Sequence, residues 1–253
     1  MLKRLALLTA LALSPLPALA QSASEHVAMG DRDQVAMNAA GALTHYEAAL
    51  AAEPTDYAAL WKAALAATDL GEYNPDESQR KALFAKAEGY GRRAVAANPN
   101  DAESHFVLAR AIGRNALSMG KRDRVKFAGE VRKEALEALR LSPNHAGALH
   151  VMGVWNAEVR RLSGVERFFA KNLLGGKVFD TASWNDAVSY LERAVAADPD
   201  RITHRLDLAK VYADVGNKAK AREQYEWVVR ATPHDFNDPH YKREAEEALR
   251  SLR

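Results

Sequence analysis

A phrase of small or apolar residues followed by a proline recurs five times, and it limits the fold more than any other feature of this chain. In each copy three residues are spaced by four and then three positions, and a proline follows five residues later. The copies are Ala42, Tyr46, Ala49 and Pro54; Ala87, Gly91, Ala94 and Pro99; Val131, Ala135, Ala138 and Pro143; Ala187, Leu191, Ala194 and Pro199; and Ala221, Tyr225, Val228 and Pro233. This spacing places the three residues on one helical face, where small side chains let a second helix approach closely. The proline ends each helix.

The distances between these prolines identify the repeat. Successive prolines lie 45, 44, 56 and 34 residues apart, and the last interval is the period of tetratricopeptide repeats. We therefore predict an all-α, tetratricopeptide-like right-handed α-solenoid of about five helical hairpins, with three insertions and a C-terminal capping helix. Helices are expected near 33–53, 57–70, 77–97, 101–118, 122–141, 145–162, 183–197, 201–215, 217–231 and 239–252.

The N-terminus has the three parts of a secretory signal peptide. Lys3 and Arg4 precede an apolar run over residues 5–13, and Ala18-Leu19-Ala20 is a small-x-small pattern that predicts cleavage after Ala20. We expect residues 1–20 to be a signal peptide, 21–30 a flexible leader and 31–253 a single tetratricopeptide-like domain. The alternative is an uncleaved N-terminal anchor. Cleavage would leave no transmembrane span and would place the protein in the periplasm or outside the cell.

Charge and cysteine content exclude several classes of function. The chain has 35 Lys and Arg against 33 Asp and Glu, and loss of Lys3 and Arg4 would make it formally neutral. A neutral chain lacks the global positive field that favours nucleic acids. The absence of cysteine excludes disulfides, zinc–thiolate sites and a cysteine nucleophile.

The first helix of each repeat in such an array lines the concave side. Residues at the inward positions form an apolar strip with a few cationic groups. We predict that they bind a peptide or protein partner, and that the protein is a non-catalytic interaction scaffold. They are Trp61, Leu65, Phe106, Arg110, His150 and Val154. The alternative for the aromatic residues is that they simply pack between repeats.

The longest insertion, residues 162–183, separates the two helices of the fourth repeat. Phe168 and Phe169 belong to a short amphipathic helix there, and we include them among the predicted partner-binding residues. The segment is either a lid over the concave side of the array or a plug that fills a gap in the solenoid. A lid would allow an alternative function, in which the protein carries an apolar small ligand or lipid covered by this insertion.

Basic residues cluster around the turn between the helices of the third repeat. We expect a solvated turn whose basic side chains form local salt bridges to Glu103 and Glu130. The alternative is that this cluster holds an acidic partner. The basic residues are Arg110, Arg114, Lys121, Arg122, Arg124 and Lys126.

Signals of catalysis are absent from the sequence. There is no H-E-x-x-H or G-x-S-x-G motif, and the Gly175-Gly176-Lys177 stretch lacks the other residues of a phosphate-binding loop. His234, Asp235, Asp238 and His240 gather near the last turn, which we interpret as an exposed polar turn rather than a metal site. We predict no enzyme activity, cofactor, metal or catalytic residue.

Several residues resemble one known family. These are His150, Gly153 and Trp155, followed by Glu158-Val159, Leu162-Ser163, Glu166-Arg167, Leu174-Gly175 and Thr181, together with the earlier stretches 123–126 and 142–144. From about Pro99 onward the chain resembles the regulator of microtubule dynamics proteins, and the long insertion is part of the resemblance. The resemblance implies a tetratricopeptide-like helical fold and a binding role. Eukaryotic members are associated with microtubules and organelle membranes, whereas this chain has a bacterial-type export signal.

Overall fold

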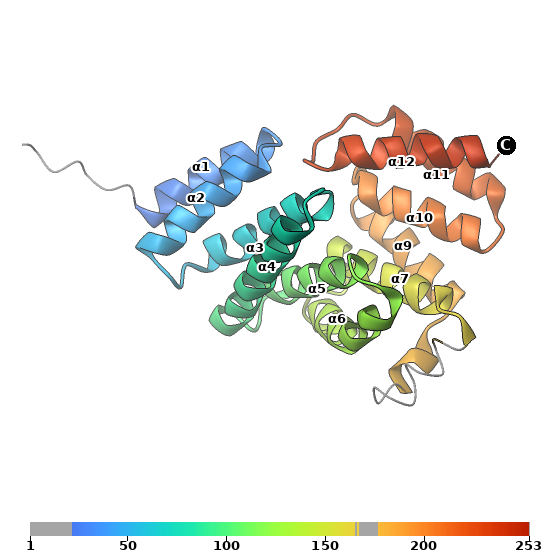
Figure 1. Cartoon of the computed structure of the whole chain (residues 1–253), viewed down its shortest axis with the longest axis horizontal. Helices are drawn as coiled ribbons and strands as arrows, with labels where there is room; N and C mark the ends of the chain where they lie inside the picture. The colour runs from blue at the N-terminus through green and yellow to red at the C-terminus, as the bar shows by residue number, and fades with distance from the viewer. Residues whose placement is uncertain (1–21, 165, 167–176, 253) are drawn as a thin grey trace, which may run out of the picture.

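The chain folds into paired helices that follow one another along an arc (Figure 1). A computed structural model describes residues 22–164, 166 and 177–252. The hairpins are α1 (Ala23–Val35) with α2 (Ala39–Ala52), α3 (Tyr57–Glu72) with α4 (Glu77–Ala97), α5 (Ala102–Leu117) with α6 (Lys121–Leu141), α7 (Ala146–Arg161) with α9 (Trp184–Ala197), and α10 (Ile202–Asp214) with α11 (Lys218–Arg230). The insertion after α7 contains the 3-10 helix η1 (Lys177–Thr181), and α12 (Asp238–Ser251) follows the fifth hairpin. The described residues contain no β-strand, which confirms the predicted all-α class.

The recurring phrase forms the contacts between helices, as predicted. Its non-proline residues are all buried in α2, α4, α6, α9 and α11. Gly91 shows why a small residue is needed, because a Cβ atom there would lie 3.0 Å from the Cα atom of Leu108. The same holds at Gly153, where a Cβ atom would lie 2.5 Å from Cγ of Leu191. Close approach of the helices therefore depends on these small positions.

Each phrase proline lies in the turn after its helix, and a capping residue often follows two positions later. Pro54 precedes Asp56, whose side chain accepts a hydrogen bond from the Ala59 N–H at the start of α3. Pro99 precedes Asp101, which caps α5 in the same way. The proline stops one helix and the cap starts the next, so the turn stays short.

The arc has an inner and an outer layer. The first helices of successive hairpins, α3, α5, α7 and α10, contact one another in order, and α12 packs on α10 and α11. The second helices α4, α6, α9 and α11 lie outside them. The first helices therefore supply the concave surface, as expected for a tetratricopeptide-like array.

The N-terminal region differs from the prediction. Residues 21–30 are predicted to be a flexible leader, but residues 23–35 form α1. Ser22 and Glu25 make a capping box at its start, and Gly30 packs against the Tyr46 ring. The expected helix over 33–53 is also interrupted, because Met37 has a φ of 57° in the turn before α2. The leader is thus the first helix of the first hairpin. The predicted signal peptide lies outside the described residues.

Candidate functional site

An apolar pocket of about 100 Å³ opens between α5, α6 and α7. Its walls are mostly aliphatic, and Trp155 and Phe179 add two aromatic rings. The described lining residues are Ala109, Arg110, Gly113, Arg114, Ala116, Leu117, Arg124, Val125, Ala128, Val131, His150, Val151, Val154, Trp155, Glu158, Val159, Leu162 and Phe179. An apolar cavity of this size accommodates roughly one apolar side chain.

A second, charged pocket of about 110 Å³ adjoins the first on the concave side, between α5, α7 and α10. Its described lining residues are Arg114, Leu117, Val154, Ala157, Glu158, Arg161, Asp207, Lys210 and Val211. Arg114, Leu117, Val154 and Glu158 line both pockets. We call the two pockets together the groove.

Charged side chains in the groove are held by ion pairs. Glu158 bridges two cations, with 2.9 Å between its carboxylate and the Arg124 guanidinium and 2.6 Å to that of Arg161. Asp207 lies 3.2 Å from the Lys210 ammonium and accepts a hydrogen bond of 2.9 Å from Nε2 of His150. Although burial alone would raise the pKa of the Asp207 carboxyl, Lys210 and His150 hold it well below its ordinary value. Asp207 is therefore an anion that fixes both neighbours.

Two histidines stack beside Asp207. The ring centroids of His150 and His204 lie 4.8 Å apart, and both side chains are buried. Burial lowers the pKa of His150, and the hydrogen bond to Asp207 only partly opposes this effect. Burial also lowers the pKa of His204 well below its ordinary value, and the neighbouring His150 adds to the effect. Both rings are therefore neutral at pH 7.

The second hairpin and α12 meet across the groove. Nδ2 of Asn237, just before α12, donates a buried hydrogen bond of 2.9 Å to the backbone oxygen of Asp69 in α3. The Tyr241 hydroxyl donates to Glu72 at 3.0 Å, and the Tyr73 hydroxyl donates to Glu244. Figure 1 shows the amino end of α12 next to the end of α3.

Tyr73 also stacks on His240, with ring centroids 4.3 Å apart. We call this junction the clasp, defined by Asp69, Glu72 and Tyr73 on the α3 side and Asn237, His240, Tyr241 and Glu244 on the other. In a solenoid each repeat normally contacts only its neighbours, whereas the clasp joins residues about 170 positions apart.

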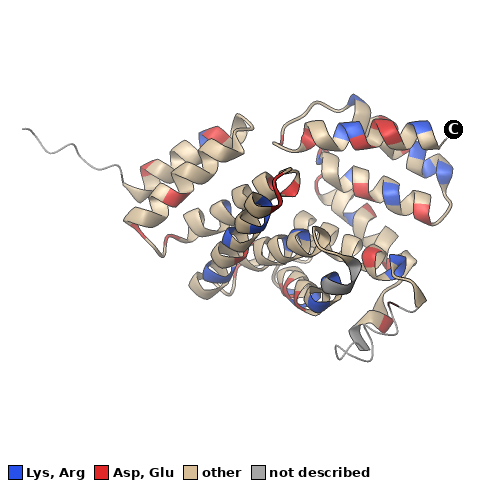
Figure 2. Cartoon of the chain, in the orientation of Figure 1, with Lys and Arg blue, Asp and Glu red and all other residues tan. Residues whose placement is uncertain are grey.

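The clasp is tied to the groove by buried arginines. Arg110 lies 2.6 Å from Asp69, and Arg114 lies 3.1 Å from Glu72. On the other side Lys210 lies 2.8 Å from Glu244. Cations that line the groove thus bind carboxylates of the clasp, which joins α3 to α12 and closes the helices between them into a ring. Figure 2 shows both signs of charge interspersed along α10 and α12.

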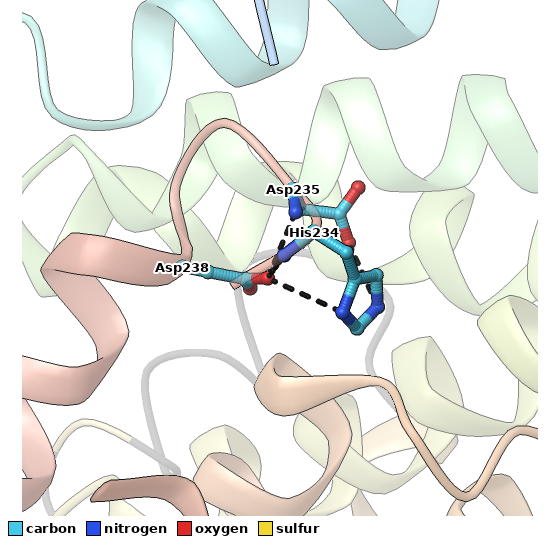
Figure 3. Close-up of side chains that lie close together, drawn as sticks. All are labelled: His234, Asp235 and Asp238. Atoms are coloured by element: carbon cyan, nitrogen blue, oxygen red, sulfur yellow. Dashed lines mark hydrogen bonds and ion pairs between the residues drawn. The ribbon is translucent and has the colours of Figure 1, made fainter. Parts of the chain in front are cut away.

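The polar cluster before α12 has a structural role (Figure 3). One carboxylate oxygen of Asp238 accepts hydrogen bonds from the backbone N–H groups of His234, at 2.9 Å, and Asp235, at 2.8 Å. Asp235 lies 2.8 Å from the Arg201 guanidinium. His234, Asp235 and Asp238 are close enough to hold a cation, but Asp235 already pairs with Arg201 and Asp238 already accepts two backbone hydrogen bonds. The cluster shapes the turn that leads into the clasp.

The structure brings together three of the predicted binding residues. Arg110, His150 and Val154 line the apolar pocket. Trp61, Leu65 and Phe106 lie half-buried against the N-terminal core, outside both pockets. The Phe106 ring packs 4.8 Å from that of His145, which is the packing role given as the alternative for the aromatic residues. Phe168 and Phe169 lie outside the described residues.

The described part of the insertion packs inward. Leu162, Phe179 and Ala182 are buried with Trp155 and Val159 in one core cluster. These residues behave as a plug, and Leu162 and Phe179 also form one wall of the apolar pocket. The insertion therefore helps to build the groove.

Among the described side chains of the basic turn, Arg110, Arg114 and Arg124 do not form the predicted salt bridges. Glu103 pairs with His145 and Glu130 with Arg92, whereas Arg110 and Arg114 turn to Asp69 and Glu72 in the preceding hairpin. The sequence holds a signal for this arrangement. The acidic pair and the basic pair each occupy one face of successive first helices, with spacings of three and four positions, and their opposite signs indicate a contact between repeats.

Fold and groove define the class: this is a tetratricopeptide-like helical repeat protein. A family model described as "Regulator of microtubule dynamics protein 1-3" matches residues 20–253, so the chain belongs to that family and the resemblance is confirmed. The chain is 27% identical over 215 residues to regulator of microtubule dynamics protein 1 of Bos taurus, covering 83% of this chain and 65% of the relative. It is 24% identical over 165 residues to regulator of microtubule dynamics protein 3 of Rattus norvegicus, covering 65% of this chain and 35% of the relative.

Solved structures support the same fold. A thermophilic tetratricopeptide-repeat protein of Thermus thermophilus matches with a TM-score of 0.63 and 22% identity, over 89% of this chain and 99% of that chain. Identity at this level shows the fold alone. None of the described helices combines the length and the apolar character that a bilayer crossing requires.

Proposed function

We propose that this protein is a non-catalytic scaffold that binds a peptide or protein partner in the groove. The observation that carries the proposal is the continuity of the two pockets through Arg114, Leu117, Val154 and Glu158. The apolar pocket suits an apolar side chain of a partner, and the adjoining charged pocket suits a polar residue next to it in the partner's sequence. Extended peptides and amphipathic helices are recognised in this way. Arg110, His150 and Val154 remain the predicted binding residues.

The chemistry of the groove favours binding over catalysis. Its carboxylates pair with arginine or lysine, as Glu158 does with Arg124 and Asp207 with Lys210. A general acid or base works best when its pKa lies near the operating pH, and the pKa of Asp207 is shifted away from that range. The charged side chains of the groove therefore suit the binding of a charged partner.

We further propose that the protein is exported to the periplasm, on the strength of the residue pattern at 1–20. The chain spans about two-thirds of the length of the type 1 relatives it matches, at 65% for the Bos taurus protein. An exported protein does not meet tubulin, so we do not transfer a microtubule partner to it. Fractionation of cells, with the mass of the purified chain measured, tests export. A chain beginning at Gln21 in the periplasmic fraction supports it, and a full-length cytoplasmic chain opposes it.

Site-specific photocrosslinking tests the binding proposal. A benzoylphenylalanine at Leu117, which lines both pockets, should form a discrete adduct with a partner protein in intact cells. The matched control places the same residue at the partly exposed Glu226 of α11, outside the groove. Equal adducts from both positions, or none from Leu117, would argue against the groove. A lipid that co-purifies and is seen by native mass spectrometry would favour the carrier alternative.

A further inference from the structure

The groove carries more positive than negative charge. Among its described lining residues are five cationic side chains, Arg110, Arg114, Arg124, Arg161 and Lys210, and two anionic ones, Glu158 and Asp207. Both anions already serve two partners each. The groove walls therefore have a formal excess of positive charge, although the sequence as a whole is close to neutral.

Carboxylates from outside the groove balance this excess. Asp69 and Glu72 reach Arg110 and Arg114 from α3, Glu244 reaches Lys210 from α12, and Asp214 at the end of α10 pairs with Arg161. The first three of these carboxylates belong to the clasp. The molecule thus places its own acidic side chains on the cations that face the groove.

One of these ion pairs is open to exchange. Lys210 and Glu244 are each 36% exposed at the side chain, whereas the side chains of Arg110 and Asp69 are 12% and 11% exposed. Exposed ion pairs contribute little net stability, and buried ones are costly to break. An incoming carboxylate could therefore replace Glu244 on Lys210 and leave the Arg110 pair in place.

We propose that the groove accepts an acidic segment of a partner protein, with one apolar side chain in the apolar pocket and a neighbouring carboxylate on Lys210 and Arg114. In this inference, which rests on the proposed function, Glu244 occupies the position of the partner's carboxylate until the partner arrives. Displacement of Glu244 also frees the hydroxyl of Tyr73 and loosens the clasp. Binding and opening of the ring are then coupled, because both use Lys210.

Selection from a displayed random-peptide library on the purified mature chain tests the chemistry of the partner. The expected result is enrichment of peptides with Asp or Glu next to Leu or Phe. The control selection uses Leu117→Glu, checked for folding by circular dichroism, and should lose these peptides. Enrichment of neutral or basic peptides that Leu117→Glu loses would overturn the acidic partner and leave the proposed function standing. Peptides that bind the original chain and Leu117→Glu equally, or no enrichment at all, would contradict both the acidic partner and the proposed function.

The strongest acidic peptide, labelled with fluorescein, then tests the role of Glu244. Glu244→Gln should raise its affinity by about fivefold, the change that one exposed ion pair accounts for, and Lys210→Gln should lower it similarly. Glu226→Gln, which alters an exposed pair with Arg230 on α11, should have no effect. Unchanged affinity in Glu244→Gln would overturn the competition with the clasp. If phosphatidylglycerol vesicles compete with the peptide and bind more tightly, the ligand is a membrane surface and the protein partner is wrong.

Discussion

Small residues at the contacts between helices determine how closely the layers approach. Gly91 and Gly89 lie two positions apart in α4 and differ in this respect. A Cβ atom at Gly91 would meet the backbone of Leu108, whereas nothing lies within 4 Å of one at Gly89. The recurring phrase could be predicted from sequence because this requirement involves only helices that follow one another in the chain.

Alanine substitutions in α4 test this requirement. Gly91→Ala should lower the free energy of unfolding by about 1–3 kcal/mol, because the backbone of Leu108 must move. Gly89→Ala should raise it by about 0.5–1 kcal/mol, since alanine is the better helix former at an exposed position. Urea unfolding measures both. Equal effects of the two substitutions would show that the close approach at Gly91 is not needed.

The stacked pair His150 and His204 makes stability depend on pH. Both pKa values are lower in the folded chain than the ordinary value of 6.5. The unfolded chain therefore binds more protons below that pH. The free energy of unfolding should be highest above about pH 6.5 and should fall as the pH drops, at up to about 1.4 kcal/mol per pH unit for each histidine.

Urea unfolding from pH 5 to pH 8 measures this slope. His204→Phe keeps an aromatic ring and removes one titrating group, so its slope should be shallower between pH 5 and 6.5. His234→Asn, an exposed site away from the pair, should keep most of the original slope. A wild-type free energy that stays constant down to pH 5 is incompatible with neutral buried histidines.

At the scale of elements, α1 shows where sequence patterns fail. Its packing face uses Ala23, Val27 and Gly30, and their weak amphipathic signal predicts a leader rather than a helix. The structure instead ties α1 to the next two helices through Asp31. Its carboxylate accepts a 2.9 Å hydrogen bond from the buried Tyr46 and pairs with Lys62 at 2.6 Å.

Asp31→Ala tests whether α1 is a folded part of the array. Loss of the acceptor should cost about 1–3 kcal/mol, because the Tyr46 hydroxyl is left without its partner in a buried position. Arg32→Ala changes the exposed neighbour and should cost less than about 0.5 kcal/mol. Thermal unfolding measures the loss of stability in Asp31→Ala and in Arg32→Ala. If both are neutral, residues 23–35 contribute nothing to the fold.

At the scale of the whole molecule, the clasp closes the part of the arc from α3 to α12 into a ring, and α1 and α2 lie outside it (Figure 1). The sequence predicts the hairpins, since each depends on residues within one or two repeats. It does not predict the clasp, which depends on the curvature accumulated from α3 to α12. The sequence also predicts that Arg110, His150 and Val154 face inward, but it does not reveal that Arg110 pairs with Asp69 of α3 and His150 with Asp207 of α10.

Asn237→Ala tests the closure of the ring. Loss of its buried hydrogen bond to the Asp69 backbone should cost about 1–3 kcal/mol. Hydrogen exchange should become faster in both α12 and the C-terminal end of α3, since the clasp couples them. Asn217→Ala, which removes a cap on α11, should speed exchange near α11 and spare α3. Faster exchange confined to α12 would mean that the ends are not coupled.

The most direct test of the groove is a map of where a bound peptide touches the chain. Amide chemical-shift changes should be recorded while the labelled protein is titrated with the peptide selected on it. The largest changes should fall on Arg114, Leu117, Val154, Glu158 and Lys210, with smaller changes in α12 as the clasp loosens. Changes concentrated on the outer helices α4, α6, α9 and α11, with the groove unaffected, would show that binding occurs elsewhere.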